Sequence, residues 1–329
     1  MKIGIVGPGI MPIPPVGWGA CEILIWDYAK TLELLGHECI IYNTQDMNHV
    51  ISLIKNDNLD IVHIQYDNYA HIADKISSFV KLVLITSHFG YIEQLNKWGG
   101  YIQVFNQIKS QTQENVYHAV LSQGIKEVYL KHGIPENRIF VTPNGANASL
   151  FKYIEAPQEL QKSIYLAKID NRKRQYLFQE ISSLHFAGNV ADKRFNTKSL
   201  RYLGEWSKDT LYSNLSHYGN LVLLSDGEAD PLVVKEALVC GLGLVISEYS
   251  TAGLDLTKPY ITVIPENKIS DVRFVESELI RNKNISAKMR SEIREYGLTF
   301  DWEILVKMYE KKITSITNEI SSSDTTRTD

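Results

Sequence analysis

The sequence is poor in cysteine, with three among 329 residues and no Cys-x-x-Cys pair. Two of the three fall inside segments that read as helix or strand interiors, which favours a reducing compartment. The chain also has no apolar run long enough to span a bilayer, and Met1 leads straight into an expected strand instead of a signal peptide. We therefore expect a cytoplasmic protein.

An excess of basic charge is absent as well. Lys and Arg number 34 against 38 Asp and Glu, which gives a net charge of −4. The 18 tyrosines are scattered and do not alternate with basic residues, so a dedicated nucleic-acid binder is not expected. A chain of this length, with 44% hydrophobic and 22% charged residues, is typical of a globular protein of two domains.

Two cofactor motifs are missing. After the first expected strand the chain reads Gly7-Pro8-Gly9, but the dinucleotide-binding fingerprint needs a third glycine where Pro12 stands. No acidic residue closes the second expected strand, 38–42, so nicotinamide binding is not expected. There is no clear Asp-x-Asp motif for a metal either, and we expect a metal-independent protein without a cofactor.

Strand and helix patterns alternate along the chain in two series, which predicts parallel sheets and two α/β domains. In the first series we expect strands at 3–6, 38–42, 59–64, 80–86, 103–106, 118–121 and 138–142, with helices at 20–35, 111–117 and 124–132. A polar linker, 152–161, separates the series. In the second we expect strands at 163–167, 185–188, 221–224, 243–247 and 260–264, with helices from 175, at 208–218, after 231, at 285–296 and at 302–316.

The most informative stretch is 220–250, which reads as a strand, a polar loop, a helix and a second strand. Asp230 and Pro231 form a helix start, with an acceptor side chain at the N-cap and proline at the first helical position. Glu228 precedes this start and Glu236 lies inside the helix. The first free amides after Pro231 would therefore offer a phosphate site flanked by two hydrogen-bond acceptors; they belong to Leu232, Val233 and Val234.

A second candidate is the loop 168–174, which carries four cations in seven residues after an expected strand. Such a loop fits either a phosphate clamp or an ordinary solvated basic loop. Two histidines, His63 and His88, end strands of the first series. A strand-end histidine is more often a satisfied edge residue than a catalyst, but both positions should lie on the ligand side of the sheet.

In their order along the chain these segments resemble retaining glycosyltransferases of family 4, which have the GT-B fold. Glu228 and Glu236 match the E-x7-E element of that family, although Leu244 stands where the family favours proline. Gly19-Ala20-Cys21-Glu22 resembles its G-G-x-E, with alanine as the second residue. In its G-R-x4-K-G pattern, Lys168 takes the place of the arginine and Lys173 that of the lysine.

The resemblance implies two Rossmann-like domains facing across a cleft. We expect an acceptor-binding domain at 1–150, a nucleotide-sugar-binding domain at 151–299, a helix at 300–317 crossing back to the first domain, and a disordered tail at 318–329. The implied reaction transfers a sugar from a nucleoside diphosphate sugar to an acceptor hydroxyl with retention of anomeric configuration. The acceptor would be a glycan, a lipid-linked molecule or a small molecule, and a lipid-linked one would bring the protein to a membrane surface.

The resemblance also implies roles for individual residues. Lys168 and Lys173, helped by Arg172 or Arg174, would neutralise the leaving diphosphate. Glu236 would bind the ribose, and Glu228 and His88 would hold the transferred sugar. Backbone groups of three further segments would meet the donor: the diphosphate at Gly19, Ala20, Leu232 and Val233, and the base beside Gly204 and Trp206. The acceptor would lie near His63, Tyr66 and Trp18.

Three other functions fit the same fold. A sugar-nucleotide epimerase would convert the donor without an acceptor. A non-catalytic subunit would bind a nucleotide sugar without transferring it, and the substitution at Lys168 together with the altered glycine loop favours this alternative. A phosphorylase-like enzyme would need a lysine-bound pyridoxal cofactor, for which the sequence has no motif.

Overall fold

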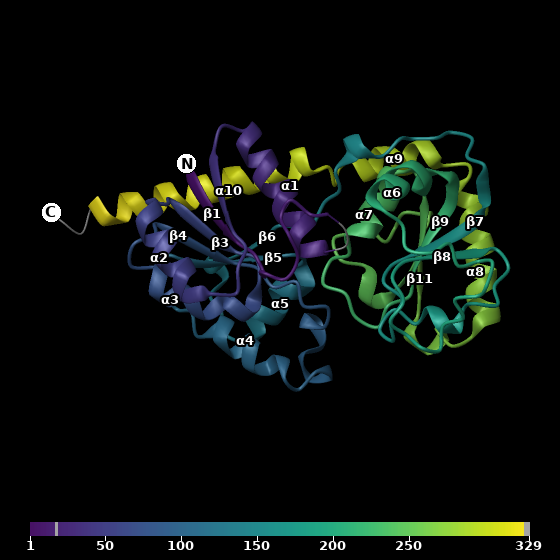
Figure 1. The fold of residues 1–329 in the computed structure, drawn as a ribbon, viewed down its shortest axis with the longest axis horizontal. Coiled ribbons are helices and arrows are strands. Elements are labelled where there is room, and N and C mark those ends of the chain that lie inside the picture. The colour runs from purple at the N-terminus through teal and green to yellow at the C-terminus, as the bar shows by residue number, and fades with distance from the viewer. Residues whose placement is uncertain (17–18, 326–329) are drawn as a thin grey trace. The chain divides into compact units, whose positions relative to one another are not determined.

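The chain folds as two α/β units, each built around one sheet (Figure 1). The computed structural model describes residues 1–16 and 19–325. Unit 1 combines Met1–Pro143 with the end of the chain from Trp302 onwards, and unit 2 is Asn144–Asp301. The chain therefore leaves unit 1 at Pro143, a little before the expected boundary at 150, and returns to it at Trp302.

Unit 1 has a six-stranded sheet in the order β2-β1-β3-β4-β5-β6, and every neighbouring pair is parallel. Its central strands are buried, as expected for a sheet covered by helices on both faces. The strands are β1 (Lys2–Val6), β2 (Glu38–Tyr42), β3 (Ile61–Ile64), β4 (Leu82–Ile85), β5 (Val116–Val120) and β6 (Ile139–Val141). The helices are α1 (Ala20–Leu34), α2 (Met47–Asp57), α3 (Ala73–Ile76), α4 (Tyr101–Lys109), α5 (Gln123–Lys131) and α10 (Trp302–Thr325).

Two predicted elements of unit 1 are wrong. The strand expected at 103–106 lies inside α4, whose buried residues Tyr101, Phe105 and Ile108 follow helical spacing. A short apolar run does not distinguish a strand from the buried face of a helix, and here the flanking apolar residues decide it. The helix expected at 111–117 is a loop followed by the start of β5.

Unit 2 has a five-stranded parallel sheet in the order β11-β10-β9-β7-β8. Its strands are β7 (Glu159–Leu166), β8 (Leu184–Ala187), β9 (Tyr218–Leu223), β10 (Gly243–Ser247) and β11 (Ile261–Ile264). Its helices are α6 (Lys208–Asn214), α7 (Leu232–Val239), α8 (Val272–Ser286) and α9 (Arg290–Leu298). Residues of β9 and β10 are buried along their full length.

Two predictions for unit 2 need correction. The helix expected from Gln175 is a single 3-10 turn, Gln175–Leu177, which Arg174 precedes in a left-handed conformation with φ 60°. The helix expected at 285–296 spans the end of α8 and most of α9. The sequence reading missed the body of α8, which is capped by the Asp271 side chain.

The last helix, α10, belongs to unit 1 and packs on α1. Three aromatic rings join the two helices: Tyr28 of α1 lies 5.1 Å from Trp302 and 5.2 Å from Tyr309, measured between ring centroids. The helix was expected to end near 316 and to be followed by a disordered tail, but it continues to Thr325. Residues 326–329 of the expected tail lie outside the described part of the chain.

Both sheets reverse their strand order at one point. In unit 1 the second strand, β2, lies on one side of β1 and the third strand, β3, on the other; β8 and β9 flank β7 in the same way in unit 2. The reversal lies between β1 and β3 in unit 1 and between β7 and β9 in unit 2. The loops that follow two such neighbouring strands lead to opposite faces of the sheet and leave a crevice at its carboxyl edge, where ligands bind in open α/β sheets.

Candidate functional site

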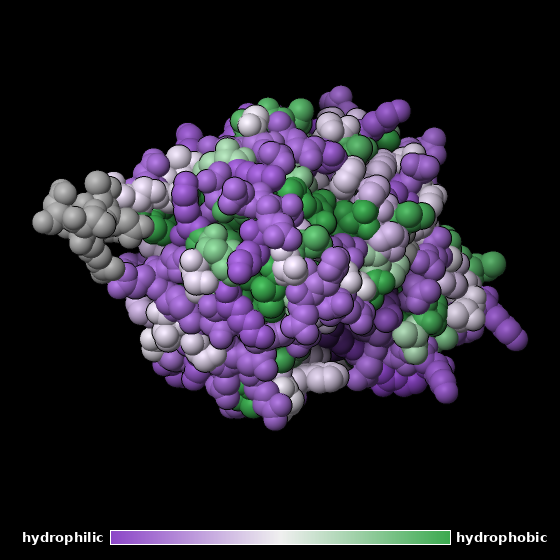
Figure 2. All heavy atoms as spheres, turned by 60° about the vertical axis from the view of Figure 1, so that its left-hand side comes forward, coloured by the Kyte–Doolittle hydropathy of each residue, from purple (hydrophilic) through white to green (hydrophobic). Residues whose placement is uncertain are grey.

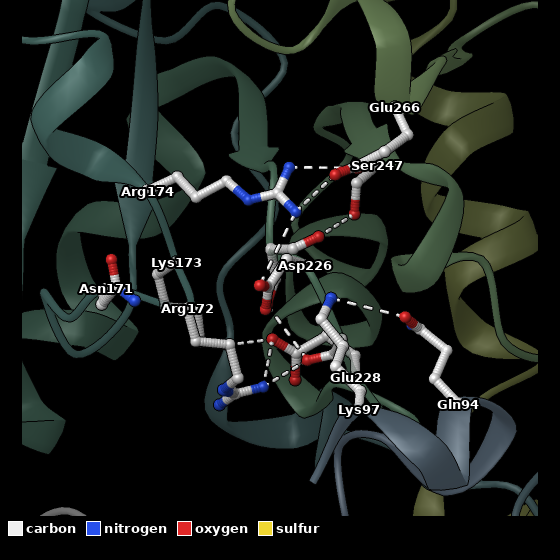
Figure 3. Close-up of polar contacts among 12 residues, drawn as sticks. Gln94, Lys97, Asn171, Arg172, Lys173, Arg174, Asp226, Glu228, Ser247 and Glu266 are labelled. Atoms are coloured by element: carbon white, nitrogen blue, oxygen red, sulfur yellow. Dashed lines mark hydrogen bonds and ion pairs between the residues drawn. The ribbon is translucent and has the colours of Figure 1, made fainter.

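In unit 2 the loops after β7 and β9 are joined by charged side chains (Figure 3). Lys173 and Arg172 of the first loop both bind the Oε1 atom of Glu228 in the second. The Arg172 Nη1 atom lies 3.0 Å from Oε1 and also donates to the Gly227 carbonyl. These residues, Arg172, Lys173 and Glu228, form what we call the Glu228 cluster, which carries one net positive charge when all three are ionised.

Backbone contacts hold the two loops in register. The hydroxyl of Tyr165, on β7, donates to the Lys173 carbonyl and accepts from the Leu224 amide at 2.8 Å. The Asp226 amide donates to the Arg172 carbonyl at 3.0 Å. The Lys173 side chain therefore starts from a fixed backbone position, and nothing in the sequence had indicated Tyr165 as a positioning residue.

Burial and charge act in opposite directions on the Glu228 cluster. Burial alone would raise the pKa of Glu228, but Lys173 and Arg172 outweigh this effect and hold the pKa of the carboxyl below its ordinary value. Burial lowers the pKa of Lys173 relative to a free lysine, and the attraction of Glu228 counteracts it. Glu228 is thus an ionised carboxylate whose charge the two cations compensate.

The other two cations of the basic loop have different surroundings. Lys168 is exposed at the end of β7 and has no ion-pair partner among residues 1–16 and 19–325. Arg174 makes two hydrogen bonds to the Glu266 carboxylate, at 2.7 and 3.0 Å, and lies 3.8 Å from Asp226 (Figure 3). Of the two arginines that could assist Lys173, the structure brings Arg172 to it and commits Arg174 to acidic partners.

The start of α7 differs from the prediction. Its N-cap is Pro231, and the Asp230 side chain does not cap it. Asp230 instead forms a fully buried ion pair with Lys235 at 2.9 Å and accepts from the Asn144 amide at 2.7 Å. The Lys235 ammonium also donates to the Ala252 carbonyl at 2.6 Å. A sequence-level cap signal was overridden because the interior of unit 2 needs a partner for its buried lysine.

One face of α7 is left partly accessible. It consists of Leu232, Val233 and Glu236, while the remaining residues of the helix are buried. The Val234 amide, which was expected to be free, donates to the Pro231 carbonyl at 3.2 Å. Leu232 and Val233 thus retain the outward amides of the first turn, and Glu236 lies one turn further along on the same face.

The segment expected beside the base follows β8. Gly188 has φ 146°, and an added Cβ would meet the Ala167 carbonyl oxygen at 2.0 Å, so only glycine fits there. The Gly188 amide donates to the Gly204 carbonyl at 2.9 Å, and Gly204 has φ 80°. Trp206 is buried against Tyr218, with 6.2 Å between ring centroids, so its indole packs in the interior of the unit.

In unit 1 a buried carboxyl group, Glu22 in the first turn of α1, lies against the glycine loop before that helix. Gly19 is the N-cap of α1 and has φ 151°. The Glu22 carboxylate is buried at the first turn and accepts from the Met11 amide at 3.3 Å. An added Cβ on Gly19 would lie 2.6 Å from Glu22, so a side chain there would displace the carboxylate. Ala20 begins the helix, and Trp18 lies outside the described residues.

His63 is an interior residue. Its side chain is 1% exposed. The Thr86 hydroxyl donates its hydrogen to the Ala119 carbonyl, so it must accept from His63 Nε2, which lies 2.8 Å away. Nδ1 then accepts from Tyr309 at 2.9 Å and from Gln65 at 3.2 Å. The expectation that His63 contacts the acceptor substrate is corrected, because both ring nitrogens already make hydrogen bonds inside unit 1 and burial lowers the pKa of the ring to about 3.

His88 occupies the more accessible position. Its Nε2 atom donates to Gln65 Oε1 at 2.9 Å, which leaves Nδ1 as a hydrogen-bond acceptor. Burial lowers its pKa to about 4, so the ring is neutral at pH 7. Tyr66, half-buried beside Tyr69 at 5.1 Å between centroids, lies in the loop after β3. Tyr69 joins this loop to the one after β1 by donating to the Pro8 carbonyl at 3.0 Å.

A buried carboxyl group that was not among the predicted site residues lies at the same edge. Asp67 Oδ2 accepts from Ser87 and from Tyr101, both at 2.6 Å, and all three side chains are buried. Phe89 stacks on Tyr101 with 3.5 Å between ring centroids. Asp67 lies at a strand end in the sequence as His63 does, and that position was the one available signal.

Among the described residues, no group of three or more His, Cys, Asp or Glu side chains is arranged to hold a metal ion. Within the same residues, none of the helices combines the length and the apolar composition needed to cross a membrane. The face in Figure 2 is mostly hydrophilic, with apolar side chains interspersed among polar ones.

Comparison with known proteins identifies the fold. No family model matches the sequence, and no curated protein sequence matches it. Solved structures do. HepE from Anabaena in complex with UDP-glucose is 12% identical and has a TM-score of 0.73, with 96% of this chain and 100% of that chain covered. Sucrose-phosphate synthase from Thermosynechococcus elongatus is 13% identical, with a TM-score of 0.74 and coverage of 97% and 100%.

The lipopolysaccharide outer core galactosyltransferase WaaB in its apo form is 20% identical, with a TM-score of 0.69 and coverage of 96% and 99%. Similarity at these identities shows the fold alone, and it extends over nearly the whole chain. The expected GT-B fold, with two parallel-sheet α/β domains, is confirmed.

Proposed function

We propose that this protein is a glycosyltransferase that moves a sugar from a nucleoside diphosphate sugar to an acceptor hydroxyl with retention of anomeric configuration. The observation that carries the proposal is the Glu228 cluster at the strand-order reversal of unit 2, where two cations and a carboxylate converge from the loops after β7 and β9. Three of the similar structures support it, since HepE was solved with UDP-glucose, with UDP, and with UDP and glucose.

The donor would occupy the carboxyl edge of unit 2. Lys173, Arg172 and the exposed Lys168 would bind the diphosphate together with the first amides of α7. Glu236, on the accessible face of α7, would accept from the ribose hydroxyls. The loop that Gly188 and Gly204 shape would receive the base. From unit 1, the amides of Gly19 and Ala20 would contribute to the diphosphate, as the family resemblance implies.

Catalysis then depends on stabilising the leaving group. As the bond from the anomeric carbon to the phosphate breaks, negative charge grows on the phosphate oxygens while the carbon becomes positive. Fixed cations in a partly buried loop stabilise that charge without having to reorganise, which is worth several kcal/mol for one well-placed group. We propose that Lys173 and Arg172 perform this role and that the enzyme needs no metal, since they place two positive charges at one point.

Retention follows from the family resemblance, in which the acceptor attacks on the face that the leaving phosphate vacates and the phosphate takes its proton. Glu228 is not assigned as a nucleophile, because both cations of the cluster bind its carboxylate. Its role would be to hold hydroxyls of the transferred sugar. His88, which is neutral and has a free acceptor nitrogen among the described contacts, would accept from another hydroxyl of that sugar.

The carboxyl edge of unit 1 would bind the acceptor. The groups gathered there are the neutral His88 and Gln65 and the Asp67 carboxyl group, which accepts from two hydroxyl groups. Such a lining suits an uncharged hydroxyl compound better than an anion. The three free cysteines fit a reducing compartment, so we propose the cytoplasm as its location.

A binding and turnover series tests the proposal. The protein is screened by thermal shift against UDP-, GDP-, ADP- and TDP-linked sugars, and the best binder is followed for slow donor hydrolysis and for transfer to a panel of sugar acceptors. We expect one base to stabilise the protein and the Lys173→Met variant to lose turnover. Proton NMR of the product would show the same anomeric configuration as the donor. Binding of no nucleotide sugar, or inversion at the anomeric carbon, would contradict the proposal.

A further inference from the structure

The carboxylate of Glu228 occupies the two cations that a diphosphate would need. Lys173 and Arg172 bind the same oxygen atom, Oε1, and the side chains of Glu228 and Lys173 are each 10% exposed. A diphosphate that approaches these cations must therefore separate or share an existing pair of ion contacts. In the ligand-free site the Glu228 carboxylate offsets one of the two positive charges, and this affects different ligands unequally.

We infer that Glu228 makes the site discriminate between the sugar-bearing donor and the bare nucleoside diphosphate that transfer leaves behind. The inference rests on the proposed function and assigns to Glu228 a specificity role in addition to holding the sugar. It concerns the balance of two affinities, whereas the proposed function concerns whether either ligand binds and reacts.

Diphosphate binding changes the groups that surround Glu228. When a diphosphate takes Lys173 and Arg172, the carboxylate loses its two cationic partners in a buried position, which is costly unless further hydrogen-bond donors take their place. A nucleotide sugar brings hydroxyl groups next to its diphosphate, and these can donate to the displaced carboxylate. A bare nucleoside diphosphate brings none.

Charge adds to the same preference. The terminal phosphate of a bare nucleoside diphosphate carries more negative charge than the phosphodiester it becomes when a sugar is attached. That additional negative charge would lie beside the ionised Glu228 carboxylate, and neighbouring like charges in a partly buried site repel strongly. The carboxylate thus penalises the product and accommodates the substrate, which favours product release after transfer.

The substitution Glu228→Gln separates these effects, because it keeps the size and one carbonyl acceptor but removes the charge. In this variant residue 228 no longer forms an ion pair with Lys173 or Arg172, and a terminal phosphate meets no repulsion from residue 228. The bare diphosphate should gain affinity. The nucleotide sugar should gain much less or lose affinity, since hydroxyls donate more strongly to a carboxylate than to an amide.

The matched control is Glu266→Gln. Glu266 is also a carboxylate of unit 2 that binds a cation of the same loop, Arg174, at 2.7 Å, so its removal changes net charge by the same amount. A general increase in positive potential would then appear in both variants, whereas discrimination by the Glu228 carboxylate would appear in Glu228→Gln alone.

Calorimetry of matched ligand pairs tests the inference: UDP with UDP-glucose, GDP with GDP-mannose, ADP with ADP-glucose and TDP with TDP-glucose. For the pair that the unmodified protein binds, we expect Glu228→Gln to tighten the bare diphosphate about tenfold and to move the ratio of the two dissociation constants by at least that factor. In Glu266→Gln the ratio should stay within about twofold of the unmodified protein.

Each other outcome is decisive. An unchanged ratio in Glu228→Gln, or a bare diphosphate that binds more weakly, would overturn the inference while leaving the proposed function in place. An equal change of ratio in Glu266→Gln would reduce the effect to general electrostatics and also overturn it. If the unmodified protein binds none of the eight ligands, the proposed function itself fails, and the inference fails with it.

Discussion

The carboxyl edges of the two sheets share a topology but differ in chemistry. In unit 2, the loops after β7 and β9 are joined by the charged Glu228 cluster, with Arg174, Asp226 and Glu266 beside it. In unit 1, the corresponding loops after β1 and β3 are joined by a neutral contact, the Tyr69 hydroxyl on the Pro8 carbonyl. Strand order thus determines where a crevice forms, and the side chains determine what it binds.

The two units also differ in the charge state of their buried ionisable side chains. Unit 1 buries His63 and His118 as neutral rings, with pKa values of about 3 and about 4. Unit 2 buries ions in pairs, as in Asp230 with Lys235. An edge of paired ions can exchange a partner for a phosphate, whereas an edge that is built of neutral side chains around the Asp67 carboxyl group suits hydroxyl groups.

Breaking the buried pair of unit 2 should have the largest effect. In Asp230→Ala, Lys235 keeps a buried charge without its carboxylate, and we expect a loss of about 3–5 kcal/mol in the free energy of unfolding. The double variant Asp230→Leu with Lys235→Met should lose less, because no unpaired charge remains. Hydrogen exchange in increasing urea, read on peptides of each unit, measures both. Equal losses in the single and double variants would contradict this account.

Removing one cation of the Glu228 cluster should affect turnover more than folding. Lys173→Met is expected to lower the rate of transfer by about 10²–10³, because a preorganised charge at the leaving group is lost. Lys193→Met, at an exposed lysine of the same unit, serves as the control and should retain the full rate. The measurement is turnover of the best-binding nucleotide sugar, and a Lys173→Met variant with normal turnover would exclude this lysine from catalysis.

Acid should destabilise unit 1 first. His63 and His118 have folded pKa values of about 3 and about 4, below the ordinary value, so the unfolded chain binds more protons between those values and about 6.5. Stability is therefore lost as the pH falls below 6.5, by roughly 1.4 kcal/mol for each histidine at pH 5.5.

Unit 2 should lose stability only at a lower pH than unit 1. The pKa of Glu228 is held below its ordinary value, so its contribution to unit 2 is present above about 4.5 and is lost only at lower pH. His185 of unit 2 has a lowered pKa as well, but it is only half-buried. Hydrogen exchange at pH 5.5 and 7.5 should show unit 1 opening more easily at the lower pH, and equal behaviour of both units would contradict the assignment of buried neutral histidines.

The smallest effect is expected at the end of the chain. In Tyr309→Phe the donor to His63 Nδ1 is removed, but Gln65 still donates to the same atom. We expect a loss of about 1 kcal/mol in the stability of unit 1 and no change in nucleotide binding, since the hydroxyl serves only the interior of that unit. Urea unfolding and calorimetry with the best-binding nucleotide measure the two quantities. A loss of nucleotide affinity would show that this hydroxyl also affects unit 2.

The sequence predicted features that depend on neighbours in the chain. The strand, loop and helix of 220–250 carry strong local signals, and the structure has β9, α7 and β10 there. It failed where distant partners decide. Asp230 has the pattern of a cap, but it accepts from the Asn144 amide 86 residues earlier, besides pairing with the nearby Lys235. Arg174 has the pattern of a phosphate ligand, but it binds Glu266 92 residues later. Such pairings follow from the packing of the sheet and leave no periodic pattern.

The membership of α10 in unit 1 has a consequence for how the molecule is made. Trp302 and Tyr309 complete the packing around Tyr28 and His63. The core of unit 1 therefore stays incomplete during synthesis until α10 has been translated, although the strands of this unit are made before those of unit 2. Unit 2 is continuous in the chain and has all of its strands and helices earlier. A premature stop near residue 300 would therefore destabilise unit 1, whose strands are translated first, and leave unit 2 with all of its elements.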